Sequence, residues 1–166
     1  MYDSVGMAPV RRIAQPSLGQ TVGAMRQFAY QGAADMQIGR LVERICSTIQ
    51  PGDYASEVLA CYYWVCQNIR YMRDPLDVEL LKWPIRVVES GNGDCDDIAT
   101  LLAAMMMRCG NRCSFVVASL DPSRRPSHVF VVVHTPQNGT VVLDPVANAV
   151  TSQMLRRMTK ATTVPV

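Results

Sequence analysis

One cysteine stands where the chain would hold a reactive thiol. Cys95 follows a glycine-rich turn and begins a largely apolar stretch that runs to Cys109. If this stretch is a helix, Cys95 lies in its first turn, where free backbone N–H groups and the helix dipole favour a thiolate and can hold an oxyanion. Gly91, Asn92 and Gly93 form the turn along which a substrate would approach, because glycine allows a sharp bend and close backbone contact.

The charged neighbours of this thiol set a condition on its chemistry. Asp94, Asp96 and Asp97 flank Cys95, and negative charge at this distance raises the pKa of a thiol. A nucleophilic cysteine here therefore needs a partner that takes its proton. His128 can be that partner, because an imidazole base is the usual activator of a cysteine nucleophile.

The spacing of two strand-like runs brings a carboxylate to this histidine. His128 begins one run, Asp144 ends the next, and residues 136–139 form a turn between them. If His134 pairs with Thr140, His128 and Asp144 share one face of the hairpin at a diagonal spacing of roughly 7–8 Å between backbones. His134 lies about 13 Å along the strand from the residue opposite Asp144, so His128 is the better base. A register slip of one residue would separate His128 from Asp144.

Helical periodicity predicts the elements that precede these strands. Apolar residues recur at helical spacing over residues 35–49 and 54–69, and the stretch from residue 95 to 109 is apolar on more than one stripe. The third helix is therefore expected to be central, with Gly110 as a left-handed cap. Between the second and third helices, Pro75 and Pro84 bracket a stretch that we interpret as an irregular crossing.

Val-rich and Phe-rich runs predict antiparallel strands at residues 113–119, 128–134 and 140–144. Helices first and strands afterwards indicate an α+β domain in which the cysteine-bearing helix packs on an antiparallel sheet. We expect this domain to span residues 35–150, after an N-terminal arm or lead-in over residues 1–34 and before a C-terminal tail over residues 151–166.

Composition argues against several function classes. A chain of 166 residues with 49% hydrophobic content can close one core, and its net charge of +2 gives no basic stripe for nucleic acid. No apolar run reaches the roughly 20 residues that a membrane span needs, and residues 1–20 do not resemble a secretory signal. We expect a protein of the cytoplasm or of a virus particle, with no nucleic acid partner and no membrane span.

The cysteines are expected to be reduced and mostly buried, since a core of this size needs no disulfides. A zinc site formed by Cys61, Cys66, Cys109 and Cys113 is the alternative, although neither pair has the two-residue spacing usual for structural zinc. We expect no metal and no organic cofactor.

Several segments together resemble the transglutaminase-like superfamily, in particular its bacterial and tailed-phage branch. They are Asn68–Tyr71 followed by Asp74-Pro75, then Gly93–Asp96, Ser127–Phe130 and Val142–Pro145. The resemblance implies a papain-like fold, a catalytic triad of Cys95, His128 and Asp144, and a reaction through a thioester intermediate.

This resemblance leaves two interpretations of function. The first is a cysteine-dependent amide hydrolase or acyltransferase that acts on a protein or peptide, including a peptidoglycan peptide, with Trp83 and Tyr71 as candidate oxyanion donors. Trp83 is equally suited to packing. The second is a structural or adaptor protein of a phage particle that binds other phage proteins through the same fold, since each triad residue alone also fits a structural role. The loop Pro122–Pro126 has two interpretations: it overhangs the site and offers two positive charges, or it is an ordinary solvated loop.

Overall fold

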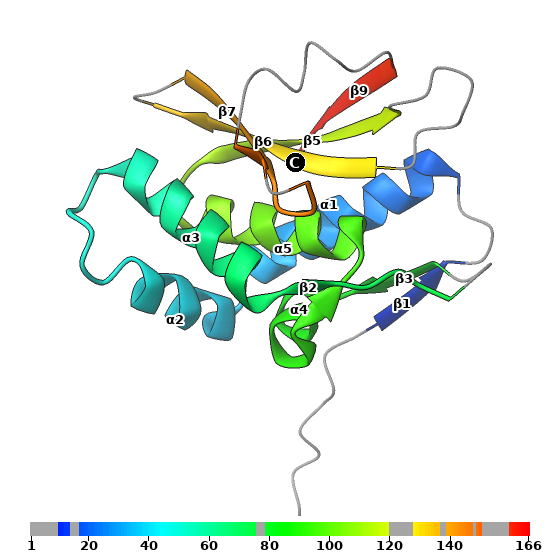
Figure 1. Ribbon diagram of the computed structural model, residues 1–166, viewed down its shortest axis with the longest axis horizontal. Coiled ribbons are helices and arrows are strands. Elements are labelled where there is room, and N and C mark those ends of the chain that lie inside the picture. The colour runs from blue at the N-terminus through cyan, green and yellow to red at the C-terminus, as the bar shows by residue number, and fades with distance from the viewer. Residues whose placement is uncertain are drawn as a thin grey trace, which may run out of the picture.

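The structure is a computed structural model that describes residues 10–13, 17–75, 79–119, 128–136, 139–147, 149–150 and 160–166. Within these residues, a layer of helices lies against one face of a five-stranded sheet (Figure 1). The predicted α+β class and the packing of the central helix on an antiparallel sheet are confirmed. None of the described helices combines the length and the apolar character that a membrane span requires.

The helical layer is organised around α5, which packs against α1 and α3 and against β5 and β6. Every residue from Ile98 to Met106 is buried, because α5 has neighbours on almost all sides. The helices are α1 (Leu18–Ala34), α2 (Met36–Ile45), α3 (Tyr54–Asn68), α4 (Pro84–Ser90) and α5 (Cys95–Arg108). Gly110, at a φ of 80°, follows α5 in the left-handed conformation that the sequence predicts.

The main sheet has the strand order β8-β7-β6-β5-β9, with antiparallel neighbours throughout. Its strands are β5 (Arg112–Ser119), β6 (His128–Thr135), β7 (Gly139–Asp144), β8 (Ala149–Val150) and β9 (Lys160–Pro165). His134 pairs with Thr140, which confirms the register predicted for the hairpin. Alternate residues such as Phe115 and Val131 face α5 in the main core, while Val116 and Phe130 belong to a second apolar cluster.

Two short ribbons lie beside the central helix. β1 (Val10–Ile13) pairs with β3 (Glu79–Lys82), and β2 (Arg70–Tyr71) pairs in parallel with β4 (Asn92–Gly93). The stretch predicted as an irregular crossing thus contains β3, and Pro84 begins α4, where the missing N–H of proline leaves no helical hydrogen bond unmade.

The prediction of an arm or lead-in is wrong for residues 18–34, which form the packed helix α1. The buried stripe of α1 includes Val22, Met25 and Phe28, but small residues such as Ala29 complete it and weaken the apolar signal. The prediction of a tail likewise fails at residues 160–165, because β9 pairs with β5. The domain boundary at residues 35–150 stays a prediction.

Candidate active site

The nucleophile candidate lies where α5 begins. Cys95 is the first residue of α5, and the side chain of Asp94 caps the helix by accepting a hydrogen bond from the backbone N–H of Asp97, 3.3 Å away. Gly91 ends α4 at a φ of 64°, which is the left-handed conformation that favours glycine. The sequence therefore turns from one helix into the next within four residues and presents Cys95 at the turn.

Backbone hydrogen bonds hold this turn against β2. The N–H of Arg70 donates to the carbonyl of Gly91, and the N–H of Met72 donates to the carbonyl of Gly93. The donor–acceptor distance is 2.8 Å in both hydrogen bonds. Gly91 and Asn92 also line a cavity of about 430 Å³ together with Arg70 and Met72. The lining residues of this cavity do not include the predicted triad, so the cavity adjoins the turn and not the thiol itself.

A buried ion pair fixes the start of α5 to β3. Asp97 accepts a hydrogen bond from the backbone N–H of Lys82 at 2.7 Å and one from its Nζ at 2.8 Å. Burial raises the pKa of the Asp97 carboxyl to about 6, and Lys82 opposes this shift without cancelling it. A Cβ on Gly93 would lie 2.7 Å from the Cβ of Asp97, so glycine is required at this contact. In the sequence, Asp97 is one of three acids around the thiol, and nothing there distinguishes it as the anchor to Lys82.

The surroundings of the Cys95 thiol favour its protonated form. Burial, together with the carboxylates of Asp96 and Asp94, raises its pKa to about 12, and the sequence predicted this effect for flanking aspartates. The backbone of Val129 and the N–H of Cys95 itself act in the opposite direction but less strongly. The expectation that the helix N-terminus favours a thiolate is therefore outweighed by burial.

The predicted histidine and aspartate form a direct pair. Nε2 of His128 lies 2.6 Å from Oδ2 of Asp144, whose side chain is fully buried. The other carboxylate oxygen of Asp144 accepts the backbone N–H groups of Val146 and Ala147, each at 3.1 Å, so the turn after β7 fixes the carboxylate. The Tyr62 hydroxyl donates to the backbone oxygen of Asp144 at 3.4 Å and ties this turn to α3.

The cysteine approaches this pair through the next residue of β6. The backbone of Val129, the residue that follows His128, is close enough to the Cys95 thiol to lower its pKa. Packing of α5 against β6 makes this approach possible (Figure 1). Sequence analysis did not anticipate Val129, because a backbone donor has no signature in the side chains.

The two candidate oxyanion donors have different surroundings. Tyr71 pairs with Gly93 in the short parallel ribbon, two residues before the nucleophile, and its side chain hydrogen-bonds Arg73. Trp83 packs against Phe28 of α1 with ring centroids 5.0 Å apart, which is the packing role that sequence analysis left open. A role for either residue as a donor stays a prediction, and the loop Pro122–Pro126 lies outside the described residues.

Comparison with known proteins assigns the family. Residues 40–145, more than half of the chain, match the family described as the transglutaminase-like superfamily. The chain belongs to the transglutaminase-like superfamily. Among curated proteins, none matches this transglutaminase-like chain.

Solved structures share the transglutaminase-like fold at low sequence identity. A candidate protease from Parabacteroides distasonis superposes with a TM-score of 0.62 and 13% identity, over 78% of this chain and 26% of its own. A candidate cysteine protease from Cytophaga hutchinsonii superposes with a TM-score of 0.58 and 15% identity, over 95% of this chain and 53% of its own. Calcium-bound LapG from Legionella pneumophila superposes with a TM-score of 0.56 and 13% identity, over 82% of this chain and 81% of its own. The chain thus spans about a quarter and about half of the first two proteins, and these likenesses show the fold.

Proposed function

We propose that this transglutaminase-like chain is a cysteine-dependent peptidase or amidase in which Cys95 is the nucleophile, His128 the base and Asp144 the residue that orients the base. One observation carries the proposal. The His128 imidazole is held by a fully buried carboxylate at 2.6 Å, and the backbone of the adjacent Val129 is close enough to the Cys95 thiol to lower its pKa. A nucleophile, a base and an orienting carboxylate in this order are the parts that acyl transfer requires.

The hydrogen bond to Asp144 determines which ring nitrogen can act. Because Nε2 of His128 is engaged by the carboxylate, Nδ1 is the nitrogen left to take the Cys95 proton. The raised pKa of the thiol argues for proton transfer during attack instead of a thiolate formed in advance. The sulfur bonds to the amide carbonyl carbon, and His128 then gives the proton to the leaving amine. A thioester remains on Cys95, and water resolves it to an acid.

The N-terminus of α5 is the proposed site for the oxyanion. Cys95 is the first residue of α5, and its backbone N–H lowers the pKa of its own thiol, so this N–H is a donor beside the sulfur that would attack. We place Tyr71 ahead of Trp83 as a second donor, since Tyr71 pairs with Gly93 while the Trp83 ring is packed on Phe28.

The substrate is proposed to be a protein or peptide. Two of the structural neighbours are described as proteases or cysteine proteases, which favours hydrolysis over transfer to an amine. The cavity beside Gly91 and Asn92 provides a place for a substrate segment next to the nucleophile's turn. Membership of a phage particle, and the adaptor role that goes with it, stay predictions from the sequence resemblance.

Calcium is a variable for the assay because the Legionella structure is described as calcium-bound. In this chain, carboxylate oxygens of Asp94, Asp96 and Asp97 lie within 4.8 Å of one another. Both oxygens of Asp97 already accept hydrogen bonds from Lys82, whereas calcium takes 6–8 oxygen ligands in proteins. This group therefore fits calcium poorly, and activity should be compared with added calcium and with a chelator.

Alkylation by iodoacetamide, read residue by residue by mass spectrometry, tests the proposal without a known substrate. His128→Ala should slow alkylation of Cys95 by at least about 100-fold, because the base that removes the thiol proton is gone. Cys66 is an internal control in the same spectra, since it is also partly buried and lies outside the triad. Equal labelling of Cys95 in both proteins would contradict the role of His128 and favour the adaptor interpretation.

Trapping of the intermediate is the direct test. Incubation with an activated ester or a peptide amide should leave an acyl group on Cys95, visible as an added mass on that residue alone. Asp144→Asn should slow acylation while the chain stays folded, because an asparagine oxygen can still accept the backbone N–H groups of Val146 and Ala147. No acyl adduct on Cys95 with any of these acyl donors would overturn the proposed activity.

A further inference from the structure

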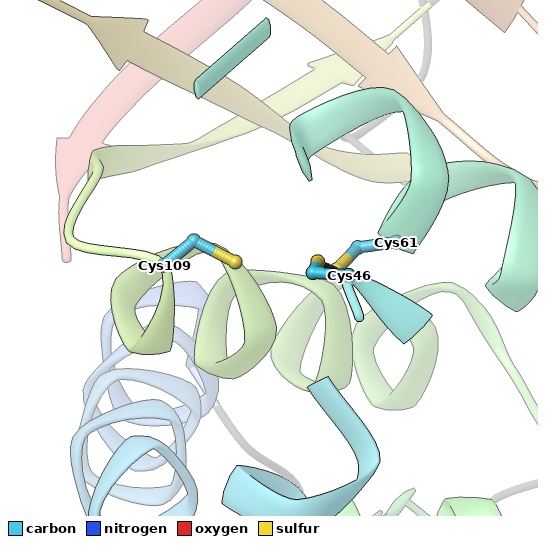
Figure 2. Close-up of side chains that lie close together, drawn as sticks. All are labelled: Cys46, Cys61 and Cys109. Carbon is cyan, nitrogen blue, oxygen red and sulfur yellow. Dashed lines mark hydrogen bonds between the residues drawn. The ribbon is translucent and has the colours of Figure 1, made fainter. Parts of the chain in front are cut away.

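Three cysteines from three different helices converge at the end of α5 that is remote from Cys95. Cys46 follows α2, Cys61 lies within α3, and Cys109 follows α5. Their sulfur atoms all lie within 4.8 Å of one another, with 4.0 Å between those of Cys46 and Cys61. Figure 2 shows the Cys109 side chain directed from the end of α5 towards the other two.

This set differs from the zinc site considered from the sequence. Cys61 and Cys109 belong to both sets, but Cys66 and Cys113 do not join the cluster. The Cys113 sulfur instead lies 4.0 Å from the backbone oxygen of Ala103, and the Cys66 thiol is close enough to Tyr62 for that side chain to lower its pKa. Two cysteines therefore behave as ordinary packing residues, whereas three place their sulfurs together. Spacing along the chain could not reveal this, because Cys46, Cys61 and Cys109 come from three separate helices.

The surroundings of the cluster favour a cation. Cys46 and Cys109 are the C-caps of α2 and α5, and helix C-termini carry the negative end of the dipole. The Glu57 carboxylate, one turn before Cys61 on α3, acts on both Cys46 and Cys109 and adds negative charge. Arg108 is a cation that acts on Cys109, and its guanidinium pairs with Glu43 at 3.0 Å.

We propose that Cys46, Cys61 and Cys109 form a site for a soft divalent metal ion of the zinc class, bound through three thiolates. Zinc–sulfur bonds of about 2.3 Å in tetrahedral geometry separate two sulfurs by about 3.8 Å. The sulfurs here are 4.0 Å to at most 4.8 Å apart, so shifts of about 1 Å or less bring all three into coordination. Each thiol releases a proton as its sulfur binds the metal, and no oxidation or reduction occurs.

The site is structural and separate from the proposed reaction. α5 has 14 residues, so its rise places the two ends about 20 Å apart. Metal bound here joins the C-terminal ends of α2 and α5 to the middle of α3 and does not reach the triad. Failure of this proposal therefore leaves the proposed activity untouched, and the converse also holds.

Cadmium titration of the reduced full chain tests the site. A Cys95→Ala background keeps the active-site thiol from binding the probe. Thiolate-to-cadmium charge-transfer absorption should saturate at one equivalent, and zinc should compete for it. Cys46→Ala and Cys109→Ala should each weaken binding by more than about 100-fold, whereas Cys66→Ala and Cys113→Ala should retain it. Zinc at 100 times its Kd should lower the equilibrium constant for unfolding by about 100-fold.

Protection from alkylation makes the test independent of variants that fail to fold. In the unsubstituted chain, zinc should block iodoacetamide labelling of Cys46 and Cys109 and leave the labelling rate of Cys66 unchanged. The proposal is overturned if cadmium gives no saturable band. It is also overturned if folded Cys46→Ala and Cys109→Ala proteins keep that band, or if zinc protects Cys66 as strongly as the cluster.

Discussion

The two ends of α5 carry two groups of thiol chemistry in opposite electrostatic surroundings. At the N-terminal end, Cys95 lies among backbone N–H donors, and the acids of the first turn suit the positive end of the dipole. At the C-terminal end, Cys109 lies among backbone carbonyls, with Cys46 and Cys61 beside it. One helix thus presents a donor-rich site and an acceptor-rich site about 20 Å apart.

The difference between the ends lies in the partner of each thiol and not in burial. Burial raises the pKa of Cys95 to about 12 and that of Cys46 to about 11. In the proposed reaction, His128 is the proton acceptor for the first thiol. At the second end, Cys61 lowers the pKa of Cys109, while the pKa of Cys61 itself rises. A metal cation bound by these thiols would displace their protons.

The largest expected effect separates the two ends by activity. Cys95→Ser should lower kcat by about 10⁶-fold, because a hydroxyl in this site has no comparable nucleophilicity. Cys109→Ser should leave kcat within about 2-fold of the parent protein, since Cys109 is a full helix length from the triad. Peptide or ester turnover at matched concentrations of folded protein measures both. A large loss of kcat in folded Cys109→Ser would break the separation of the two ends.

The second effect tests the orienting carboxylate. Asp144→Asn should lower kcat by about 10⁴-fold, as expected when the base is held in the wrong tautomer. The amide oxygen of the introduced asparagine can accept the hydrogen bonds from the Val146 and Ala147 N–H groups in place of the carboxylate, so the fold should persist. Turnover and thermal unfolding of the same preparation measure the effect. Activity within about 10-fold of the parent would show that Asp144 serves the turn and not the base.

Much of the candidate site could be predicted from the sequence because its parts follow local rules. A glycine-rich turn before an apolar helix positions Cys95, and alternation along two strands places His128 and Asp144 on one face. The register depended on a single pairing, that of His134 with Thr140, and that pairing is confirmed. Burial of the thiol, the anchor from Lys82 to Asp97 and the cluster at the far end could not be predicted, because they depend on tertiary contacts between segments distant in sequence.

The missed helix α1 shows a different limit. Ser17 and Gln20 form a capping box, with the Gln20 N–H donating to the Ser17 hydroxyl at 3.3 Å, and this signature was present in the sequence. The buried stripe behind it contains small residues such as Ala29 and Gly32, and Gly32 packs closely against Pro84. Small residues give such a stripe a weak apolar signal in the sequence. The same small residues allow α1 to approach α4 and α5 closely.

The third prediction concerns the buried acid at the N-terminal end of α5. The pKa of Asp97 is about 6 in the folded protein against an ordinary 3.8, so the native state binds more protons than the unfolded state between about pH 4 and pH 6. The free energy of unfolding should therefore fall by about 2–3 kcal/mol as pH rises through this window. Asp97→Asn should flatten that fall, because it keeps an acceptor for the Lys82 N–H but cannot ionise. Urea unfolding at several pH values measures the slope, and an unchanged slope would contradict the assignment.

The smallest effect uses Cys113 as the matched thiol outside the cluster. Burial raises its pKa to about 12 from an ordinary 9, so above pH 9 the unfolded chain loses this proton while the native state keeps it. Stability should fall with rising pH, and this thiol alone should contribute about 1 kcal/mol between pH 9 and pH 10. Cys113→Ala should remove that share of the slope in the metal-free protein, because burial of this sulfur against Ala103 is the main cause of its raised pKa and negative charge on Cys109 is the second. Urea unfolding of both proteins at pH 9 and pH 10 measures the difference, and an unchanged slope in Cys113→Ala would contradict the raised pKa of this thiol.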